Sequence, residues 1–247
     1  MLRKTLIAVI SLFILATGAF LIWALMPLGP EAEALQAIQS RDGVTVIAEQ
    51  NWLLFTPESA SPQVGFIFYP GGRVDYRSYA PVLREIAAQG YLVALVRMPL
   101  NLAVMAPGRA AEVITAHPEI TRWAAGGHSL GGAMAANYAY THPGALQGLA
   151  LWAAYPAGSN DLSQADLLVL SLYGTQDGVL RWENLEASRS LLPDDTLWVA
   201  IEGGNHAGFG SYGAQPGDGA PGISPQQQRN QIVQVMTEFL ARLQEGR

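Results

Sequence analysis

The sequence predicts an α/β fold, a doubly wound and mostly parallel sheet, preceded by one N-terminal transmembrane helix. Short, continuously apolar stretches alternate along the chain with stretches whose apolar residues recur at helical spacing. The strand-like stretches lack the polar alternation of a sheet with one wet face, so helices are expected to cover both faces. The transmembrane helix is predicted by an uncharged apolar run over residues 6–26.

Composition limits the classes of protein that this chain can belong to. Of its 247 residues, 50% are apolar and 14% are charged, which excludes a disordered protein and suits one globular domain behind the apolar run. The net charge of −6, without a basic run, makes nucleic acid an unexpected partner. The chain has no cysteine, which excludes disulfides, thiolate zinc sites and a cysteine nucleophile. We expect no metal and no cofactor.

The apolar run at residues 6–26 is long enough to cross a membrane, since as a helix it spans roughly 30 Å. Arg3 and Lys4 precede it, and Glu31 and Glu33 follow it. By the positive-inside rule, the N-terminus is expected in the cytoplasm and the rest of the chain outside it. The sequence thus predicts a single-pass protein of the cell membrane with an extracytoplasmic domain.

A cleaved signal peptide, giving a secreted protein, is the alternative interpretation of the same run. The tripeptide Ala16-Thr17-Gly18 resembles a small-residue cleavage site. The run stays apolar through Trp23, however, where a cleaved peptide would usually turn polar, and this favours the retained anchor.

The rest of the chain divides into alternating strands and helices. Residues 44–48 and 52–56 are expected to form an opening antiparallel pair. Further strands are expected at 64–69, 91–96, 123–126, 148–154, 167–173 and 197–201. Helices are expected at 79–89, 110–116, 130–140, 183–191 and 226–244.

A candidate nucleophile lies in Gly127-His128-Ser129-Leu130-Gly131, which matches the G-x-S-x-G elbow. In that elbow the serine occupies a tight strand-to-helix turn, and the glycines avoid clashes that a Cβ would cause. An apolar strand ends at the motif and a small-residue helix leaves it. An ordinary glycine-rich turn would share the pentapeptide, but this context favours Ser129 as a nucleophile.

The acid and the base follow in the order Ser, Asp, His that this architecture uses. Asp177 comes directly after the strand at 167–173, and His206 follows the strand at 197–201. Catalytic groups of open α/β sheets gather at the carboxyl ends of the strands, so Ser129, Asp177 and His206 are expected to converge. Asp177 followed by glycine is also a common turn, which is the alternative interpretation of that residue.

The other three histidines are weaker candidates for the base. His117 and His142 each precede a proline, where a surface position at a helix end is expected. His128 lies inside the elbow, where it can pack beside the site without being its base. His206 therefore remains the expected general base.

An oxyanion hole requires two backbone N–H groups aimed at the developing negative charge. The elbow supplies the amide of Leu130. The second donor is expected from the loop after the strand at 64–69, and we favour the amide of Gly72, with Arg73 as the next choice.

The motifs YPGG, GGHSLGG, YGTQDG and GGNHAGFG, in this order, resemble the α/β-hydrolase superfamily, and most of all its small bacterial branch related to dienelactone hydrolases. The resemblance covers about residues 64–243 and implies the fold and the Ser129, Asp177, His206 triad. It does not imply lactone specificity, because a dienelactone hydrolase proper has a cysteine nucleophile. Pro70 replaces the histidine usual before the oxyanion glycine.

Four residues are weaker candidates for substrate contacts. Arg73 flanks the oxyanion loop, and Met98, Trp182 and Phe209 lie near strand ends. A solvated loop for Arg73, and core or rim packing for the other three, are the competing interpretations. The long loop at 207–224 either borders the site or is a passive surface loop.

The boundaries expected are 1–30 for the anchor or signal peptide, 31–63 for a linker and the opening strands, and 64–247 for the catalytic domain. Because the motifs begin only near residue 64, residues 1–30 are expected to take no part in the fold. Only 156–166 separate two central strands, too few residues for the helical cap of lipases and many esterases. We therefore expect a cap-less, open site.

The sequence predicts a serine hydrolase that cleaves carboxylic esters, or related acyl bonds, of a small-molecule acyl substrate through an acyl-enzyme. The same triad would serve an acyltransferase, a thioesterase or a peptidase, which remain alternatives. A non-catalytic binding module of the same fold is a third hypothesis, against which the intact triad argues.

Overall fold

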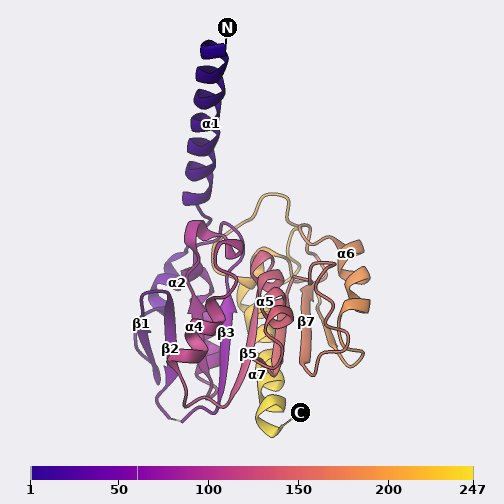
Figure 1. Cartoon of the computed structure of the whole chain (residues 1–247). Coiled ribbons are helices and arrows are strands. Elements are labelled where there is room, and N and C mark those ends of the chain that lie inside the picture. Colours follow the sequence, from indigo (N-terminus) through magenta and orange to yellow (C-terminus); the bar gives the residue numbers. More distant parts are fainter. Residues whose placement is uncertain (1, 60, 247) are drawn as a thin grey trace.

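The computed structural model describes residues 2–59 and 61–246 and has one eight-stranded sheet, in the order β1-β2-β4-β3-β5-β6-β7-β8 (Figure 1). β1 pairs antiparallel with β2, and β2 with β4, whereas every later pairing is parallel. The predicted doubly wound, mostly parallel sheet is confirmed. The strands are β1 (Val44–Ala48), β2 (Trp52–Pro57), β3 (Val64–Tyr69), β4 (Leu92–Val96), β5 (Arg122–His128), β6 (Gly148–Trp152), β7 (Leu168–Gly174) and β8 (Leu197–Ile201).

Helices cover both faces of this sheet, because each buried strand sends alternate side chains to opposite faces. In β3, Phe66 and Phe68 join a core with α3 and α7, while Ile67 and Tyr69 join a second core with α4 and α5. The domain helices are α2 (Ala32–Ala37), α3 (Ala80–Ala87), α4 (Arg109–Ala116), α5 (Leu130–Thr141), α6 (Trp182–Ala187) and α7 (Pro225–Glu245). Short 3₁₀ helices are η1 (Tyr76–Tyr79), η2 (Pro99–Asn101), η3 (Ala103–Met105), η4 (Ser188–Leu191) and η5 (Ala207–Phe209).

The N-terminal helix α1 (Leu2–Leu25) projects from one end of the domain (Figure 1). Its segment Lys4–Leu25 has a mean hydropathy of 2.5 and none of the apolar window is buried. By length and composition, this helix is able to cross a membrane.

The C-terminal end of α1 is fixed to the loop after β3. Arg73 donates from Nε to the carbonyl of Trp23 at 2.9 Å and from Nη2 to the carbonyl of Met26 at 3.0 Å. The guanidinium also lies 4.5 Å from the centre of the Trp23 ring. The last carbonyls of a helix have no partner within it, and here a side chain of the domain supplies the donors.

The chain after α1 continues this contact. Leu28 forms a β-bridge with Val74, donating its N–H to the Arg73 carbonyl at 2.8 Å and accepting from the Asp75 N–H at 3.0 Å. Asn101, in η2, donates to the carbonyl of Ala24 at 3.0 Å. The expectation that residues 1–30 take no part in the fold is therefore wrong. The contacts join residues 45 or more positions apart, which local sequence patterns do not show.

Phe66 tests the core that holds the sheet to α3 and α7. It is fully buried and packs with its ring centre 6.0 Å from that of Phe68 and 6.4 Å from that of Trp152. We expect Phe66→Ala to lower the free energy of unfolding by about 3–5 kcal/mol, since it leaves a cavity. Exposed Ile47 on edge strand β1 is the control, with an expected loss below about 1 kcal/mol for Ile47→Ala. Urea denaturation of detergent-solubilised protein measures both, and equal losses would contradict this packing.

Candidate active site

Ser129 lies at the turn where β5 ends and α5 begins. Its backbone has φ 53° and ψ −122°, a conformation that strains a residue with a side chain. Glycines on either side make the turn possible. A Cβ on Gly127 would come within 2.5 Å of the Tyr69 carbonyl oxygen, and a Cβ on Gly131 would overlap the same oxygen. The predicted elbow geometry is therefore present, with Ser129 at the carboxyl end of the sheet.

Asp177 and His206 meet on the loops after β7 and β8. His206 Nδ1 lies 2.7 Å from Asp177 Oδ2, and both side chains are buried. The other carboxylate oxygen, Oδ1, accepts the backbone N–H groups of Val179 at 2.8 Å and Leu180 at 2.7 Å. Three N–H donors thus surround the acid, as suits an ionised carboxylate. The Nδ1–H of His206 donates to it, which leaves Nε2 as the basic nitrogen.

Ser129 and His206 line one cavity of about 280 Å³. Among the described residues, Ser129 Oγ and His206 Nε2 share no hydrogen bond. Such bonds are often long before substrate binds and tighten in the complex. The remaining lining residues are Leu130, Ala133, Ala153, Ala154, Tyr155, Val179, Leu180 and Arg181.

The two residues expected to supply the oxyanion donors are close neighbours in space. A Cβ on Gly72 would come within 3.0 Å of Leu130 Cδ2, so the loop after β3 touches the first residue of α5. The N–H of Leu130, as the first of a helix, has no carbonyl one turn earlier to bond. Within residues 2–59 and 61–246, the N–H of Gly72 also has no bonded acceptor, unlike those of Gly71 and Arg73, which donate to Tyr79 Oη and the Asn101 carbonyl.

His128 is buried behind the expected base. Its ring centre is 4.3 Å from that of His206, and its Nδ1 is 2.8 Å from Tyr79 Oη. Tyr79 accepts the N–H of Gly71 and so donates its own hydrogen to His128. Burial, and then the neighbouring His206, hold the pKa of His128 well below its usual range. His128 is thus neutral and links the loop after β3, through Tyr79, to the His206 loop.

The four weaker substrate-contact residues are not among the residues that line the cavity. Arg73 bonds the end of α1, as described above. Met98 is buried in the core beneath α4 and α5, and Phe209 is buried with its ring stacked 5.4 Å from that of His128. Trp182 donates from Nε1 to the Asp177 carbonyl at 3.2 Å and packs edge-on against Tyr173. The structure corrects these expectations: hydrogen bonds to the end of α1 hold Arg73, Met98 and Phe209 are packed in the core, and Trp182 lies against the backbone of Asp177 and the ring of Tyr173.

The residues that do line the cavity were missed although a sequence signal exists. Ala153, Ala154 and Tyr155 directly follow β6, and residues 179–181 directly follow Asp177. The carboxyl ends of parallel strands are the expected place for such residues. Their small and apolar side chains carry no motif.

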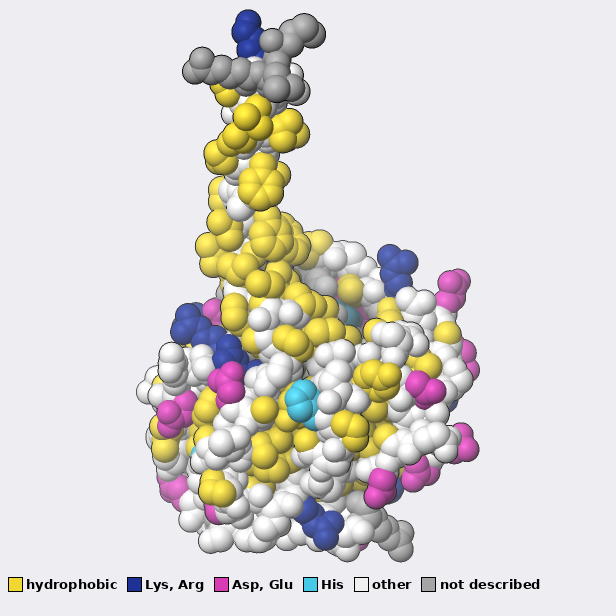
Figure 2. All heavy atoms as spheres, in the orientation of Figure 1, with side chains coloured by type: hydrophobic (Ala, Val, Ile, Leu, Met, Phe, Trp, Pro, Cys, Tyr) yellow, Lys and Arg dark blue, Asp and Glu magenta, His cyan; other side chains and the backbone are white. Residues whose placement is uncertain are grey.

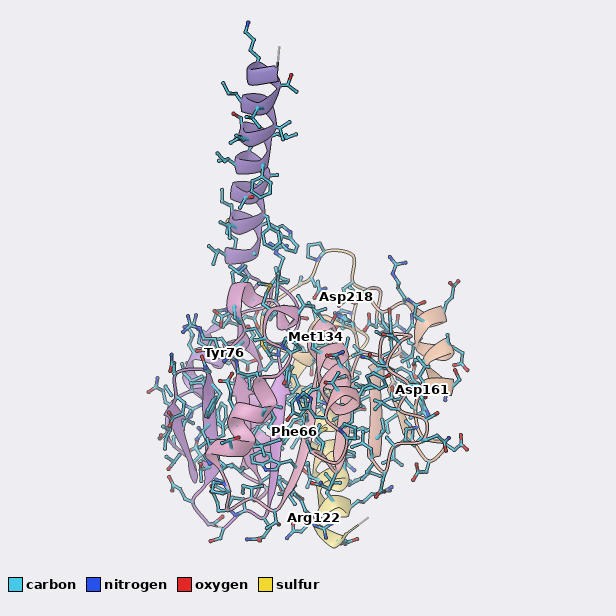
Figure 3. All side chains as sticks on the ribbon, viewed as in Figure 1. Phe66, Tyr76, Arg122, Met134, Asp161 and Asp218 are labelled. Atoms are coloured by element: carbon cyan, nitrogen blue, oxygen red, sulfur yellow. The ribbon has the colours of Figure 1, made fainter. Side chains whose placement is uncertain are left out.

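Asp218, which Figure 3 labels near the α1 end of the domain, lies on the long loop at 207–224 and joins the acid and base loops. Its Oδ1 accepts the N–H of Gly178 at 3.1 Å and that of His206 at 3.2 Å. Its Oδ2 accepts the N–H of Ala207 at 2.8 Å. The long loop is therefore a support of the site, and sequence reasoning missed Asp218 because nothing marks it among the glycines and prolines.

A model of the alpha/beta hydrolase family matches residues 65–230. The chain belongs to this family. No curated protein matches the sequence. Membership confirms the family resemblance stated from the motifs.

Solved structures of the same fold include several hydrolases. A dienelactone hydrolase from Anabaena variabilis is 15% identical with a TM-score of 0.63, over 81% of this chain and 99% of its own. The esterase domain of a Rhodothermus marinus protein is 15% identical with a TM-score of 0.62, over 81% and 98%. Thermogutta terrifontis esterase 2, phosphoramylated by tabun, is 13% identical with a TM-score of 0.59, over 83% and 96%. At these identities the likeness shows the fold.

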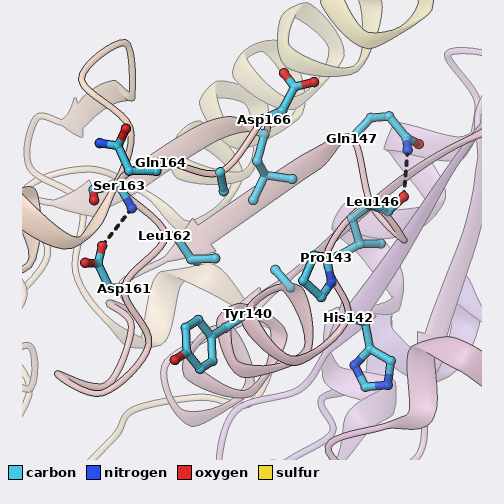
Figure 4. Close-up of a pocket in the computed structure, with 14 residues that line it drawn as sticks. Tyr140, His142, Pro143, Leu146, Gln147, Asp161, Leu162, Ser163, Gln164 and Asp166 are labelled. Atoms are coloured by element: carbon cyan, nitrogen blue, oxygen red, sulfur yellow. Dashed lines mark hydrogen bonds between the residues drawn. The ribbon is translucent and has the colours of Figure 1, made fainter.

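A second and larger cavity, of about 650 Å³, lies beside the amino ends of β6 and β7, at the opposite end of the strands from Ser129 (Figure 4). It is lined by the end of α5 and by the segments that enter β6 and β7, so it is remote from Ser129. Asp161 in its wall accepts the Ser163 N–H at 2.9 Å. In the described part of the chain, no group of three or more His, Asp or Glu residues is placed to hold a metal ion.

Asp218 provides a test of how the two loops are held. In Asp218→Asn an amide NH₂ must face backbone N–H groups, so the acid and base loops lose part of their bridge. We expect kcat on an activated ester to fall by about 10²-fold, the scale of a 1 Å misplacement, with little change in KM. Exposed Asp166, at the opposite edge, is the matched control, and Asp166→Asn should keep full activity. An unchanged kcat in Asp218→Asn would show that the bridge is dispensable.

Proposed function

We propose that the protein is a serine hydrolase that cleaves carboxylic esters through an acyl-enzyme. The observation that carries the proposal is the 2.7 Å bond between His206 and Asp177, facing the same cavity as Ser129 on its strained turn. A nucleophile, a base oriented by a buried acid, and two adjacent N–H groups are the parts that acyl transfer requires.

In the proposed reaction, Ser129 Oγ attacks the ester carbonyl carbon while its proton passes to His206 Nε2. Asp177 stabilises the resulting imidazolium, and the N–H groups of Leu130 and Gly72 face the oxyanion. The carbon–oxygen bond to the alcohol then breaks, and the alcohol leaves with the proton from His206. Water attacks the acyl-enzyme with His206 again as base, which releases the acid and restores Ser129.

Ester cleavage is favoured over the other acyl reactions by two observations. Residues 153–167 between β6 and β7 leave no room for a cap domain, which suits an accessible small acyl substrate. The proteins of similar fold include named esterases, one of them carrying an organophosphate. Acyl transfer, thioester cleavage and peptide cleavage would use the same residues. A binding module would have no need of the strained turn at Ser129.

We also propose that α1 anchors the protein in the cell membrane with the domain on the extracytoplasmic side. Lys4 before the apolar stretch and Glu31 and Glu33 after it support this orientation. Retention is favoured over cleavage near Gly18, since cleavage would leave the apolar residues 20–23 in water; Ile22, for example, is 63% exposed.

Fluorophosphonate labelling tests the nucleophile. We expect it to modify Ser129 and to fail in Ser129→Ala. Ser129→Ala and His206→Ala should each lower kcat on an activated ester by about 10⁴–10⁶-fold, with the double variant little worse, because the residues act as one unit. His142→Ala, a change at the end of α5, is the control and should keep activity. Near-normal turnover in His206→Ala would place the base elsewhere.

Truncation separates the anchor from the segment that holds the oxyanion loop. Full-length protein should stay with membranes after a carbonate wash, whereas a chain lacking residues 1–22 should be soluble and active. Removing residues 1–30 also removes the carbonyls that Arg73 and Asn101 bind, so its kcat should fall below that of the shorter deletion. Protease added to spheroplasts should digest the full-length domain. Equal kcat values in the two deletions would contradict a role for residues 23–30.

A further inference from the structure

The helix α1 leaves the domain at the side of the sheet where the parallel strands have their carboxyl ends, here called the carboxyl edge. The candidate site lies at this same edge. Arg73 follows β3 and Asn101 follows β4, so both of the side chains that hold α1 lie at the carboxyl ends of parallel strands. Ser129 follows β5 at the same edge. In Figure 3, Arg122 at the start of β5 lies at the far end of the domain from α1, and Asp218 lies near the α1 end.

The path from the helix to the nucleophile is short. The carbonyls of Trp23 and Met26 bind Arg73, which adjoins Gly72 in sequence. Gly72 in turn contacts Leu130, the neighbour of Ser129. The end of α1 and the site are therefore parts of one packed edge.

Several contacts fix the direction in which α1 leaves the domain. The guanidinium of Arg73 bonds two carbonyls, Asn101 bonds a third, and Leu28 pairs with the backbone on either side of Val74. Tilting the domain relative to the helix would break these bonds. A bilayer crossed by α1 must then lie over this edge of the sheet.

Apolar side chains are exposed at this end of the sheet. Val104 and Met105, in η3 directly after η2, are 47% and 53% exposed, and Trp182 on the far side of the acid loop is 43% exposed. Figure 2 shows apolar atoms continuing from the helix onto the adjoining end of the domain. Such residues are suited to the interfacial region of a bilayer, where apolar groups meet headgroups.

We propose that the edge bearing Ser129 lies against the bilayer surface, and that the site takes short-chain acyl esters whose alcohol part is held in the membrane. The proposal rests on the ester hydrolysis proposed above. The cavity of about 280 Å³ lies just below the usual range for ligand pockets of about 300–1,000 Å³, so its size suits a short acyl group. Water cleaves the ester, the acid enters the aqueous phase and the alcohol stays in the bilayer.

The position of the edge is tested by single cysteines, which the cysteine-free chain permits. Full-length Met105→Cys and Gln164→Cys, the latter exposed at the opposite edge, are labelled with an environment-sensitive fluorophore in phosphatidylcholine vesicles. The label at 105 should be quenched by lipid-borne quencher and protected from aqueous iodide, and the label at 164 should behave in the opposite way. Iodide quenching of both to the same extent would overturn the proposal without reference to activity.

The substrate class is tested with two esters of one acid. Ethyl butyrate is water-soluble and hexadecyl butyrate resides in the bilayer, and both form the same butyryl-enzyme. A flexible segment of about 15 Gly and Ser residues, with a reach of roughly 20 Å, is inserted between Ile22 and Trp23, which leaves the contacts of Arg73 intact. The apolar stretch that remains before the insertion, residues 6–22, still spans roughly 25 Å as a helix.

In proteoliposomes, wild type should release butyrate from both esters. The insertion should lower kcat/KM on hexadecyl butyrate by about tenfold or more while leaving that on ethyl butyrate within about twofold, because only the orientation to the membrane is lost. Hydrolysis of ethyl but not hexadecyl butyrate by wild type, or equal activity of the two proteins on both esters, would overturn the inference and leave ester hydrolysis standing. Failure on both esters would instead contradict the proposed function.

Discussion

The parallel pairing of β5, β6, β7 and β8 is the constraint on which the site depends. It sets the loops that follow β7 and β8 at one level, where Gly174 lies so close to Gly204 that a Cβ would overlap the carbonyl oxygen of Gly204. That close approach brings Asp177 and His206 within 2.7 Å of each other. On the other side, the N–H of Ser129 bonds the carbonyl of Trp152 at the end of β6. Ser129 and Asp177 are 48 positions apart, and Asp177 and His206 are 29 apart. They are brought to one site because the strands that precede them end side by side.

The loop after β3 adds a second constraint, since it has partners on three sides. Gly71 bonds Tyr79, Gly72 contacts Leu130, and Arg73 bonds the end of α1. Arg73 itself has φ 57°, an uncommon conformation for a residue with a side chain. The contacts with α1 and Asn101 hold this conformation in place. A loop that presents an N–H to a developing charge needs such support, because the donor must be positioned before the reaction.

Much of this arrangement could be predicted from the sequence, because it follows from local patterns. The strands at 44–48, 64–69 and 197–201 have the expected bounds, and the elbow glycines lie where their missing Cβ atoms are needed. The strand expected at 123–126 extends to His128, which pairs with Trp152 in β6. Glycines are uncommon in strands, so the Gly-Gly-His sequence at the end of β5 did not indicate that the strand continues to His128.

The contacts that the sequence did not reveal join segments that are distant along the chain. Asp218 and Arg73 form hydrogen bonds with backbone groups. Every residue has such groups, so the sequence does not indicate which of them these two side chains bind. Met98 and Phe209 follow strands at the same end of the sheet as the site. Their apolar side chains are nevertheless buried in the core. Position at a strand end therefore indicates the neighbourhood of a site, and only packing decides which side chains reach it.

The short segment between β6 and β7 leaves the site without a cap, and this bears on the proposed position of the site at the membrane. The described segment between these strands, residues 153–167, is too short to form a cap, and α1 leaves the domain at the end of the sheet where the strands have their carboxyl ends. In the proposed orientation, the contacts between α1 and the loop after β3 would set the candidate site at a constant height and angle above the bilayer. A substrate confined to that surface would then be presented to the site by the membrane itself.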